Sequence, residues 1–502
     1  MLLVIQLRCQ SGSGGGLART IPATMNRMSK YPEPYSPYCG LVVNDNEQYE
    51  KVQGAPHLAI SAPTRTGKTR RLLAPAAVLH PGPLVAVSSK EDLAELVLMR
   101  RGLGPTGVID LRPEKTLVWP EGVRSMVSDP TMSITSADEA LTVAETMLAT
   151  SGVGFGGASS GQTVAAGGLW ESTASRPLAC LLYAASPQGN SQGMPWVLEA
   201  VENLGIEDDE DGGATTQLSL HATPSWMTAA ALCPHPMLSD PMQRVLTFNS
   251  RMRDSVAITV SKAVTPWVRL GLSTTEHLDR LSGVDELSIE SFDVSMLDDP
   301  DASLFVIAPN TGTVAGAAVA LIDSIIRHFR KRTAQHQLEH RLLLELDEVC
   351  NSCPLPALLN YVGESAGLGV NIMATVQASS HFDVVFGPKY ADALRDIFPG
   401  TVVMYGAHER HLLEQASHWQ GLGTRRTESY EPNGGSRSQS SQLGSIIDWQ
   451  ELLPQSLEEA QLLLRGTAGR RVQIPDWSVF LEIYDGAIET RRRRQRTSRA
   501  SA

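Results

Sequence analysis

The sequence predicts an α/β fold in which a parallel sheet, with helices on both faces, is interrupted by an all-α segment. Short apolar runs bounded by turn or polar residues recur along the chain, and helical patterns separate several of them, as in buried parallel strands joined by crossover helices. The runs lie at residues 58–61, 84–88, 108–110, 304–308, 342–346, 372–376, 402–405 and 462–464. Between about residues 131 and 295 strand signals are few, so we expect an all-α insertion between two parts of one α/β domain.

These patterns divide the chain into parts. We expect an irregular leader over residues 1–45, a discontinuous α/β domain over residues 46–130 and 296–484, an all-α domain over residues 131–295, and a basic, disordered tail over residues 485–502.

Local composition refines this division. Ser136 and Glu139 have the spacing of a capping box and predict a helix start at the beginning of the all-α domain. A glycine-rich stretch at residues 152–168 and an acidic loop at residues 207–211 separate later helical patterns. Residues 424–444 are polar and rich in serine and glycine, which predicts a mobile loop.

The composition is that of a globular protein with an acidic surface. The 502 residues are 42% hydrophobic and 19% charged, values typical of a chain that buries a core. A net charge of −12 argues against a histone-like, generally basic nucleic-acid coat. The end of the chain, residues 491–502, is rich in arginine and contains no acid. We expect it to be solvated, with contact to nucleic acid or anionic lipid as the alternative.

Several absences bear on location. The chain has no apolar stretch of about 18 residues, so no spanning helix is predicted, and its start has no basic leader typical of a signal peptide. Six scattered cysteines indicate a reducing compartment. Cys350 and Cys353 form a CxxC pair without a second pair to complete a zinc site, so we interpret them as loop residues. We therefore expect a cytoplasmic protein.

A phosphate-binding loop follows the apolar run at residues 58–61. Its residues are Ala62, Pro63, Thr64, Arg65, Thr66, Gly67, Lys68 and Thr69, which fit the Walker A spacing except that Ala62 replaces the first glycine. Backbone amides of such a loop face phosphate oxygens, and a glycine before the lysine permits close approach. Lys68 is then expected to contact the β- and γ-phosphates of ATP, and the hydroxyl of Thr69 to bind Mg²⁺.

Acidic and polar residues end two further predicted strands. Asp347 and Glu348 follow the apolar run at residues 342–346, where open α/β sheets bind ligands. We expect Asp347 to hold Mg²⁺ through water, and Glu348 to orient or deprotonate the attacking water. Gln377 ends the run at residues 371–376 and is a candidate sensor of the γ-phosphate. Together with the loop, these residues predict a Mg²⁺-dependent P-loop ATPase.

In this arrangement the chain resembles the TraG/TraD family of type IV secretion coupling proteins, in an actinobacterial style. The resemblance spans residues 55–480. It is carried by the order of the phosphate loop and five further segments, which are residues 85–113, 169–186, 195–201, 345–380 and 452–477. The segment at residues 345–380 is similar to the family region that pairs the acidic strand with a Leu-Pro helix and a strand that ends in glutamine. The resemblance as a whole includes the family's TraM-recognition region.

The resemblance implies a RecA-like P-loop NTPase domain interrupted by an all-α domain that faces the cytoplasm. It implies a homo-oligomeric ring, usually a hexamer, that delivers single-stranded DNA and its relaxase to a conjugative secretion channel. The roles of Lys68, Thr69, Asp347, Glu348 and Gln377 carry over by motif position. We expect a peripheral position at the inner face of the cell membrane, next to a membrane-embedded secretion or anchoring protein.

The sequence departs from the family pattern in three respects. The N-terminal membrane helices of the family are missing, through truncation, start-site choice or reliance on a separate membrane protein. The turn at residues 363–369 lacks the arginine that family members commonly place there as an arginine finger, which acts in the nucleotide site of a neighbouring subunit. An arginine finger contributes about 10³–10⁵ in rate. The candidate replacements for this arginine are Arg395, Arg410 and Arg465. The third departure is Ala62, which replaces the first glycine of the phosphate loop.

Two other functions remain open from the sequence alone. One is a nucleotide-binding module that docks a relaxase or another protein substrate with weak or no hydrolysis, which the missing arginine favours. The other is an FtsK/HerA-like DNA translocase with the same core. Arg251 and Arg253, near Trp267, are candidates for a single-strand contact, with an exposed helix face as the alternative.

Overall fold

The structure is a computed structural model that describes residues 35–45, 48–101, 104–112, 119–151, 168–205, 223–280, 290–309, 314–430 and 437–500. The first 34 residues of the predicted leader, most of the glycine-rich stretch and the acidic loop at residues 207–211 lie outside the described residues.

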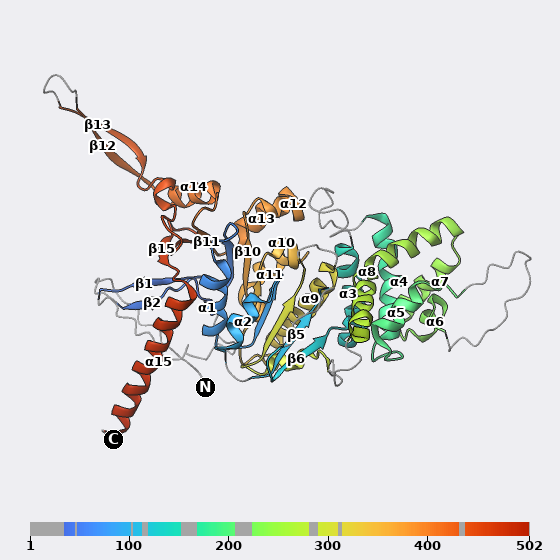
Figure 1. The fold of residues 1–502 in the computed structure, drawn as a ribbon. Coiled ribbons are helices and arrows are strands. Elements are labelled where there is room, and N and C mark those ends of the chain that lie inside the picture. The colour runs from blue at the N-terminus through green and yellow to red at the C-terminus, as the bar shows by residue number, and fades with distance from the viewer. Residues whose placement is uncertain are drawn as a thin grey trace, which may run out of the picture.

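A large mixed sheet is the middle layer of the α/β domain (Figure 1). Across the described residues its strands are, in sheet order, β2 (Tyr49–Lys51), β1 (Leu41–Val43), β15 (Arg470–Gln473), β14 (Glu459–Leu464), β11 (Gly400–Met404), β3 (Leu58–Ser61), β10 (Val370–Val376), β9 (Leu342–Leu346), β4 (Leu84–Ser88), β8 (Ser303–Ile307), β5 (Thr106–Asp110), β6 (Val123–Val127) and β7 (Glu290–Ser291). Neighbours from β11 to β7 are parallel, whereas β14, β15, β1 and β2 pair antiparallel. The loops that follow β3, β9 and β10 therefore meet at one edge.

Helices cover both faces of this sheet. Short α1 (Ala74–Leu79), α2 (Asp92–Leu98) and the start of α15 (Trp477–Ala500) pack on one face, and α9 (Ala315–Ala334), α11 (Leu358–Glu364), α12 (His381–Phe386) and α13 (Pro388–Ile397) pack on the other. Successive residues of a strand point to opposite faces. In β9 Leu343 therefore joins the first core, while Leu342 and Leu344 join the second. Burial on both faces explains why the central strands are continuous apolar runs.

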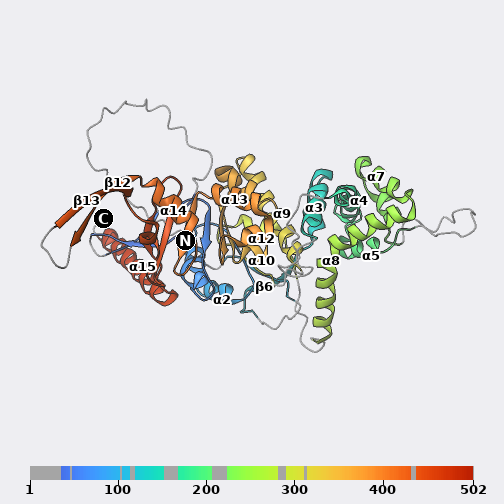
Figure 2. The same cartoon turned by 90° about the horizontal axis from the view of Figure 1, so that it is seen from above.

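The inserted domain is helical and has a core of its own. It contains η3 (Pro130–Ser133), α3 (Ala137–Thr150), α4 (Leu169–Ala185), α5 (Gly193–Val201), α6 (Trp226–Leu232), α7 (Pro236–Leu246) and α8 (Ser250–Arg280). Ser136 caps α3 by accepting a bond of 3.2 Å from the amide of Glu139. In the first turns of α9, Ala317 and Ala320 belong to this helical core, while Ala318, Val319 and the later apolar residues of the helix belong to a core on the sheet. Figure 2 shows the helical domain on one side of the sheet.

The remaining elements lie near the antiparallel edge or connect strands. They are η2 (Thr69–Leu73), η5 (Val294–Asp298), α10 (Val349–Ser352), η6 (Ser365–Leu368), α14 (Arg410–Trp419), η7 (Trp449–Leu452) and the hairpin of β12 (Leu422–Tyr430) and β13 (Arg437–Ser445). The hairpin projects from the body on the side away from the helical domain (Figures 1 and 2). Within the described residues, no helix has both the length and the apolar character needed to cross a membrane.

Four boundaries differ from the predictions. From residue 35 the predicted leader belongs to the fold, because β1 pairs with β15 and β2, and Tyr38 and Cys39 are buried. The short strand β7 falls within the segment predicted to be all-α and pairs with β6. The predicted mobile loop over residues 424–444 contains the β12–β13 hairpin, whose polar strands hide its ladder from a hydrophobicity pattern.

The predicted disordered tail over residues 485–502 is also different, because α15 continues to Ala500. Three aromatic side chains at helical spacing anchor the beginning of this helix. Phe480 stacks on Trp477 and on Tyr484, with ring centroids 5.6 and 6.0 Å apart, and Arg100 binds Asp485 at 3.1 Å. Arginine is a good helix former, so a helix that is already nucleated can propagate through the arginine-rich end.

Candidate functional site

The predicted phosphate loop connects buried β3 to the helical turn η2. Gly67 has φ of +81°, a conformation in which a side chain is strained, and a Cβ atom there would also press on the side chain of Arg71. The loop closes through the hydroxyl of Thr66, which donates to the carbonyl of Pro63 at 2.7 Å. The amide of Ala62 donates to the carbonyl of Val376 at 2.9 Å, and Ala62 has no positive φ, so alanine is accommodated in place of glycine.

Lys68 lies between the two predicted acidic residues. Its Nζ is 2.7 Å from Oε1 of Glu348 and 3.7 Å from Oδ1 of Asp347. Nε2 of Gln377 donates to the same oxygen of Glu348 at 3.3 Å. Side chains from three separated parts of the sequence therefore converge at the carboxyl edge of β3, β9 and β10. Thr69 starts η2 immediately after Lys68 and is half-buried.

Asp347 is buried and held by two hydroxyl groups. It accepts bonds from Ser88 at 3.2 Å and from Thr375 at 2.9 Å. Burial raises the pKa of Asp347, while Lys68 and the bond from Thr375 oppose the increase. The carboxylate of Asp347 and the hydroxyl of Thr69 are hard oxygen donors of the kind that Mg²⁺ prefers, with water and substrate phosphates completing its shell. The residues present thus fit the predicted metal.

Glu348 has the environment of a base that stays ionised at neutral pH. Burial by itself raises the pKa of Glu348, but the bonds from Lys68, Gln377 and Asn351 outweigh it and hold the pKa below its usual range. Its backbone is left-handed, with φ of +54°, and its amide donates to the hydroxyl of Thr375 at 2.9 Å. A non-glycine residue in this conformation is uncommon and costs free energy, which the surrounding bonds offset.

Sequence patterns had not indicated three polar residues that support this site. Ser88 ends β4 at the same sheet edge, and the strand-end argument that singled out Asp347 applies to it equally. Thr375 lies inside β10 and Asn351 inside α10, so neither stands out in an apolar run or a short helix. The role of Thr375 depends on the pairing of β9 with β10, and that of Ser88 on the pairing of β4 with β9, which the sequence does not reveal. Asn351 acts locally, because it lies three residues after Glu348 and donates to it at 3.4 Å.

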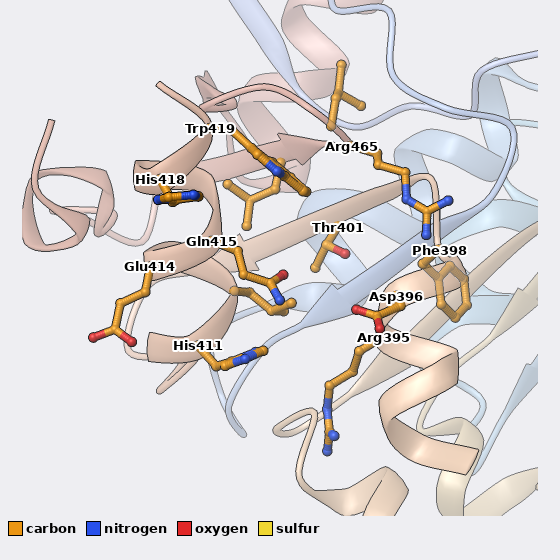
Figure 3. Close-up of a pocket in the computed structure, with 13 residues that line it drawn as sticks. Arg395, Asp396, Phe398, Thr401, His411, Glu414, Gln415, His418, Trp419 and Arg465 are labelled. Carbon is orange, nitrogen blue, oxygen red and sulfur yellow. The ribbon is translucent and has the colours of Figure 1, made fainter. Parts of the chain in front are cut away.

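Among the described interactions, none of the three candidate arginines contacts Lys68. Arg395 pairs with Asp383 and Asp392, and Arg410 pairs with Glu414 at 2.7 Å. Arg465 is exposed and lines a pocket of about 600 Å³ between α13, α14 and the end of β14, next to Asp396, Thr401 and His411 (Figure 3). The position of a finger in a neighbouring subunit therefore stays a prediction.

Trp267, the aromatic residue near the candidate DNA contacts Arg251 and Arg253, is buried. Its side chain is 6% exposed and belongs to the core of the helical domain, while Arg251 is exposed on α8. A buried indole offers no face to a nucleobase.

A buried carboxyl group two residues before Asp347 predicts a pH dependence of stability. Burial raises the pKa of Glu345 well above its usual range, against the opposing charge of Arg101, and neither carboxyl oxygen has a hydrogen-bond partner among the described residues. The folded chain therefore holds a proton that the unfolded chain loses above about pH 4.3. The free energy of unfolding should therefore fall as pH rises from about 4.3 toward the raised pKa of Glu345 in the folded chain, by at most about 1.4 kcal/mol per pH unit.

Glu345→Gln should remove this dependence, because its side chain stays neutral in both states. We expect the variant to unfold at a higher temperature than the wild type at pH 8 and at a similar temperature at pH 5. Thermal unfolding followed by circular dichroism between pH 5 and pH 9 measures the difference. Glu414→Gln, at an exposed carboxylate, is the control and should keep the wild-type slope. Parallel pH profiles for Glu345→Gln and the wild type would contradict the prediction.

Comparison with known proteins agrees with this geometry. Residues 341–457, which include Asp347, Glu348 and Gln377, match the family model described as the TraM recognition site of TraD and TraG. The chain is similar in structure to the bacterial conjugative coupling protein TrwBdeltaN70. For its unbound monoclinic form the TM-score is 0.51 and the identity 16%, over 87% of this chain and 88% of that chain. For its trigonal form with sulphate the TM-score is 0.51 and the identity 15%, over 88% and 96%.

None of the curated protein sequences matches the chain. At these identities the structural likeness establishes the fold alone, and the predicted α/β fold, a largely parallel sheet interrupted by a helical domain, is confirmed. The predicted resemblance to the TraG/TraD family is confirmed over residues 341–457, which match the family model, and the fold is similar to that of a conjugative coupling protein.

Proposed function

We propose that the chain is an ATP-driven coupling protein that moves DNA, together with a relaxase, toward a conjugative secretion channel. The observation that carries the proposal is the convergence of Lys68, Asp347, Glu348 and Gln377 at one sheet edge. The match of residues 341–457 to the TraM recognition site supports the choice of a coupling protein over other translocases with the same core.

The proposed reaction is attack of water on the γ-phosphorus of ATP, with ADP as the leaving group. Glu348 accepts the proton of the attacking water, and Lys68 moves from Glu348 to the β- and γ-phosphates. Thr69 and Asp347 would hold Mg²⁺, which neutralises charge on the phosphate oxygens when bound. Gln377, already bonded to Glu348, is placed to contact the γ-phosphate or the attacking water.

We further propose that ATP is hydrolysed between subunits of a ring, of which a hexamer is the expected form. Arg395, Arg410 and Arg465 make no contact with Lys68, Asp347 or Glu348 among the described interactions, so an arginine from a neighbouring copy would complete the site. The partners would be single-stranded DNA, a relaxase and a membrane-embedded protein that keeps the ring at the inner face of the membrane.

The rate of ATP hydrolysis by the purified chain, with and without single-stranded DNA, tests the proposal. We expect the DNA to stimulate turnover, and the rate per subunit to rise with protein concentration as rings form. ATP binding without turnover, at high concentration and with DNA present, would contradict it. That result would favour the second candidate, a docking module for a protein substrate, which the absence of an arginine from residues 363–369 supports.

A further inference from the structure

A further carboxylate, that of Glu409, is buried beside the phosphate loop, and among the described interactions it contacts none of the predicted catalytic residues. Glu409 is only 5% exposed, and its carboxylate accepts three hydrogen bonds. The hydroxyl of Ser61 donates at 2.5 Å, the amide of Ser379 at 2.6 Å and the hydroxyl of Ser379 at 2.5 Å. All three donors are uncharged, and together they fix the carboxylate between two strand ends.

Both of its partners are next to the nucleotide site along the chain. Ser61 is the last residue of β3 and directly precedes Ala62 of the phosphate loop. Ser379 comes two residues after Gln377, which binds Glu348. A shift of Gln377 toward a γ-phosphate would therefore move Ser379, because only one residue separates them.

Glu409 also stands at the start of α14, yet it does not serve that helix as a cap. It occupies the N-cap position, but its side chain makes no bond to the amides of α14. A carboxylate at this position ordinarily accepts from the first turn of its own helix. Here the carboxylate is directed at the ends of β3 and β10 instead, which indicates a role in joining the helix to those strands.

The helix held in this way forms one wall of the pocket in Figure 3. His411, Gln415 and Trp419 of α14 line the pocket, and β12 begins at Leu422, just beyond the helix. The opposite wall is attached to the same point, because Arg395 of α13 lines the pocket and donates to the carbonyl of Ser379 at 2.9 Å. Ser379 thus connects to both helices that border the pocket.

We propose that Glu409 is a positioning residue that transmits the nucleotide state from the end of β10 to α14, and from there to the pocket and the β12–β13 hairpin. This inference rests on the proposed ATPase function. ATP pulls Gln377 and thereby Ser379, and Glu409 carries the displacement into α14. In the reverse direction, a partner that engages the pocket or the hairpin would alter the position of Gln377 and the hydrolysis rate.

Hydrogen–deuterium exchange on the full chain, with ADP or a non-hydrolysable ATP analogue, tests the inference. In the wild type we expect amide protection of residues 410–419 and 422–430 to differ between the two nucleotides. In Glu409→Ala this difference should disappear and kcat should fall by about tenfold to 10²-fold, the size expected for a misplaced catalytic group, whereas ATP affinity stays near that of the wild type. Glu409→Gln keeps one acceptor oxygen and should restore part of the rate.

Two further sets of variants separate this role from a structural one. Ser61→Ala and Ser379→Ala each remove one donor with little change in volume, so they carry the same readout if Glu409→Ala does not fold. Glu414→Gln is the control on the same helix, since Glu414 also lines the pocket but is exposed and pairs with Arg410 at 2.7 Å, not with Ser61 or Ser379. It should leave protection and kcat unchanged.

The failures of the two proposals are distinguishable. A wild-type chain that hydrolyses ATP but shows the same α14 protection with both nucleotides would overturn the inference alone. So would a folded Glu409→Ala variant with wild-type kcat and an intact protection difference. A wild-type chain that shows no turnover would instead contradict the ATPase proposal on which the inference depends.

Discussion

Replacing Lys68 with alanine is expected to reduce ATP turnover by about 10³-fold or more, the scale of a charge contact made to a transferring phosphoryl group. In the structure the ammonium group is largely buried and lies between two carboxylates. Its removal takes away the contact to the phosphates and also leaves Asp347 and Glu348 close together without a cation. Two like charges in a buried site disfavour ionisation, so the pKa of Glu348 should rise in the variant and weaken it as a base.

Phosphate release at saturating ATP measures this effect, and fluorescent-nucleotide titration reports binding separately. Lys331→Ala is a matched control, because Lys331 is exposed on α9 and its Nζ is 3.8 Å from Glu139, within the helical side of the molecule. We expect it to retain wild-type turnover. Residual activity of Lys68→Ala within tenfold of the wild type would show that another group holds the phosphates.

Replacing Glu348 with glutamine is expected to separate binding from hydrolysis. Glutamine cannot accept the proton of the attacking water, and loss of a general base typically costs about 10²–10⁴ in rate. Nucleotide affinity should rise at the same time. In the structure the carboxylate of Glu348 binds Lys68 at 2.7 Å, so it competes with phosphate for this ammonium group, and a neutral amide competes less.

The measurement is a pair of numbers for each variant, kcat and the ATP dissociation constant under non-hydrolysing conditions. Glu459→Gln is a suitable control, since Glu459 lies on β14 and its carboxylate contacts Arg471 at 3.8 Å and the amide of Gln455 at 3.1 Å. Weaker ATP binding by Glu348→Gln would mean that the carboxylate supports the nucleotide site more than it competes with it. A kcat equal to that of the wild type would remove Glu348 from the role of base.

The sequence predicted the parts of the site that follow from a single strand. Lys68 comes from a local loop pattern, and Asp347, Glu348 and Gln377 each follow an apolar run, so one rule about strand ends brought them together. The connection between Ser61 and Glu409 spans 348 positions of the chain. No local pattern marks either residue, and only the pairing of β3 with β10 and β11 places them in contact.

The elements that the sequence missed share a physical cause. The strands β1 and β2 are three residues long and lie at an edge, where few apolar positions are required. The β12–β13 hairpin is held by its backbone ladder with polar residues at most positions, so composition favours a loop. The end of α15 takes its helical state from an aromatic anchor upstream and not from its own arginines.

The position of α9 has a mechanical consequence. Ala317 and Ala320 are packed into the helical domain, while Ile322 and Ile325, barely a turn further on, are packed against the sheet. A helix is stiff over this distance, because each turn is closed by its own hydrogen bonds. One stiff helix therefore packs into the core of the helical domain and into the core on the sheet at the same time. If α9 tilted relative to either core, its apolar side chains would lose their packing there. A tilt of α9 that starts at the sheet should therefore move the helical domain with it.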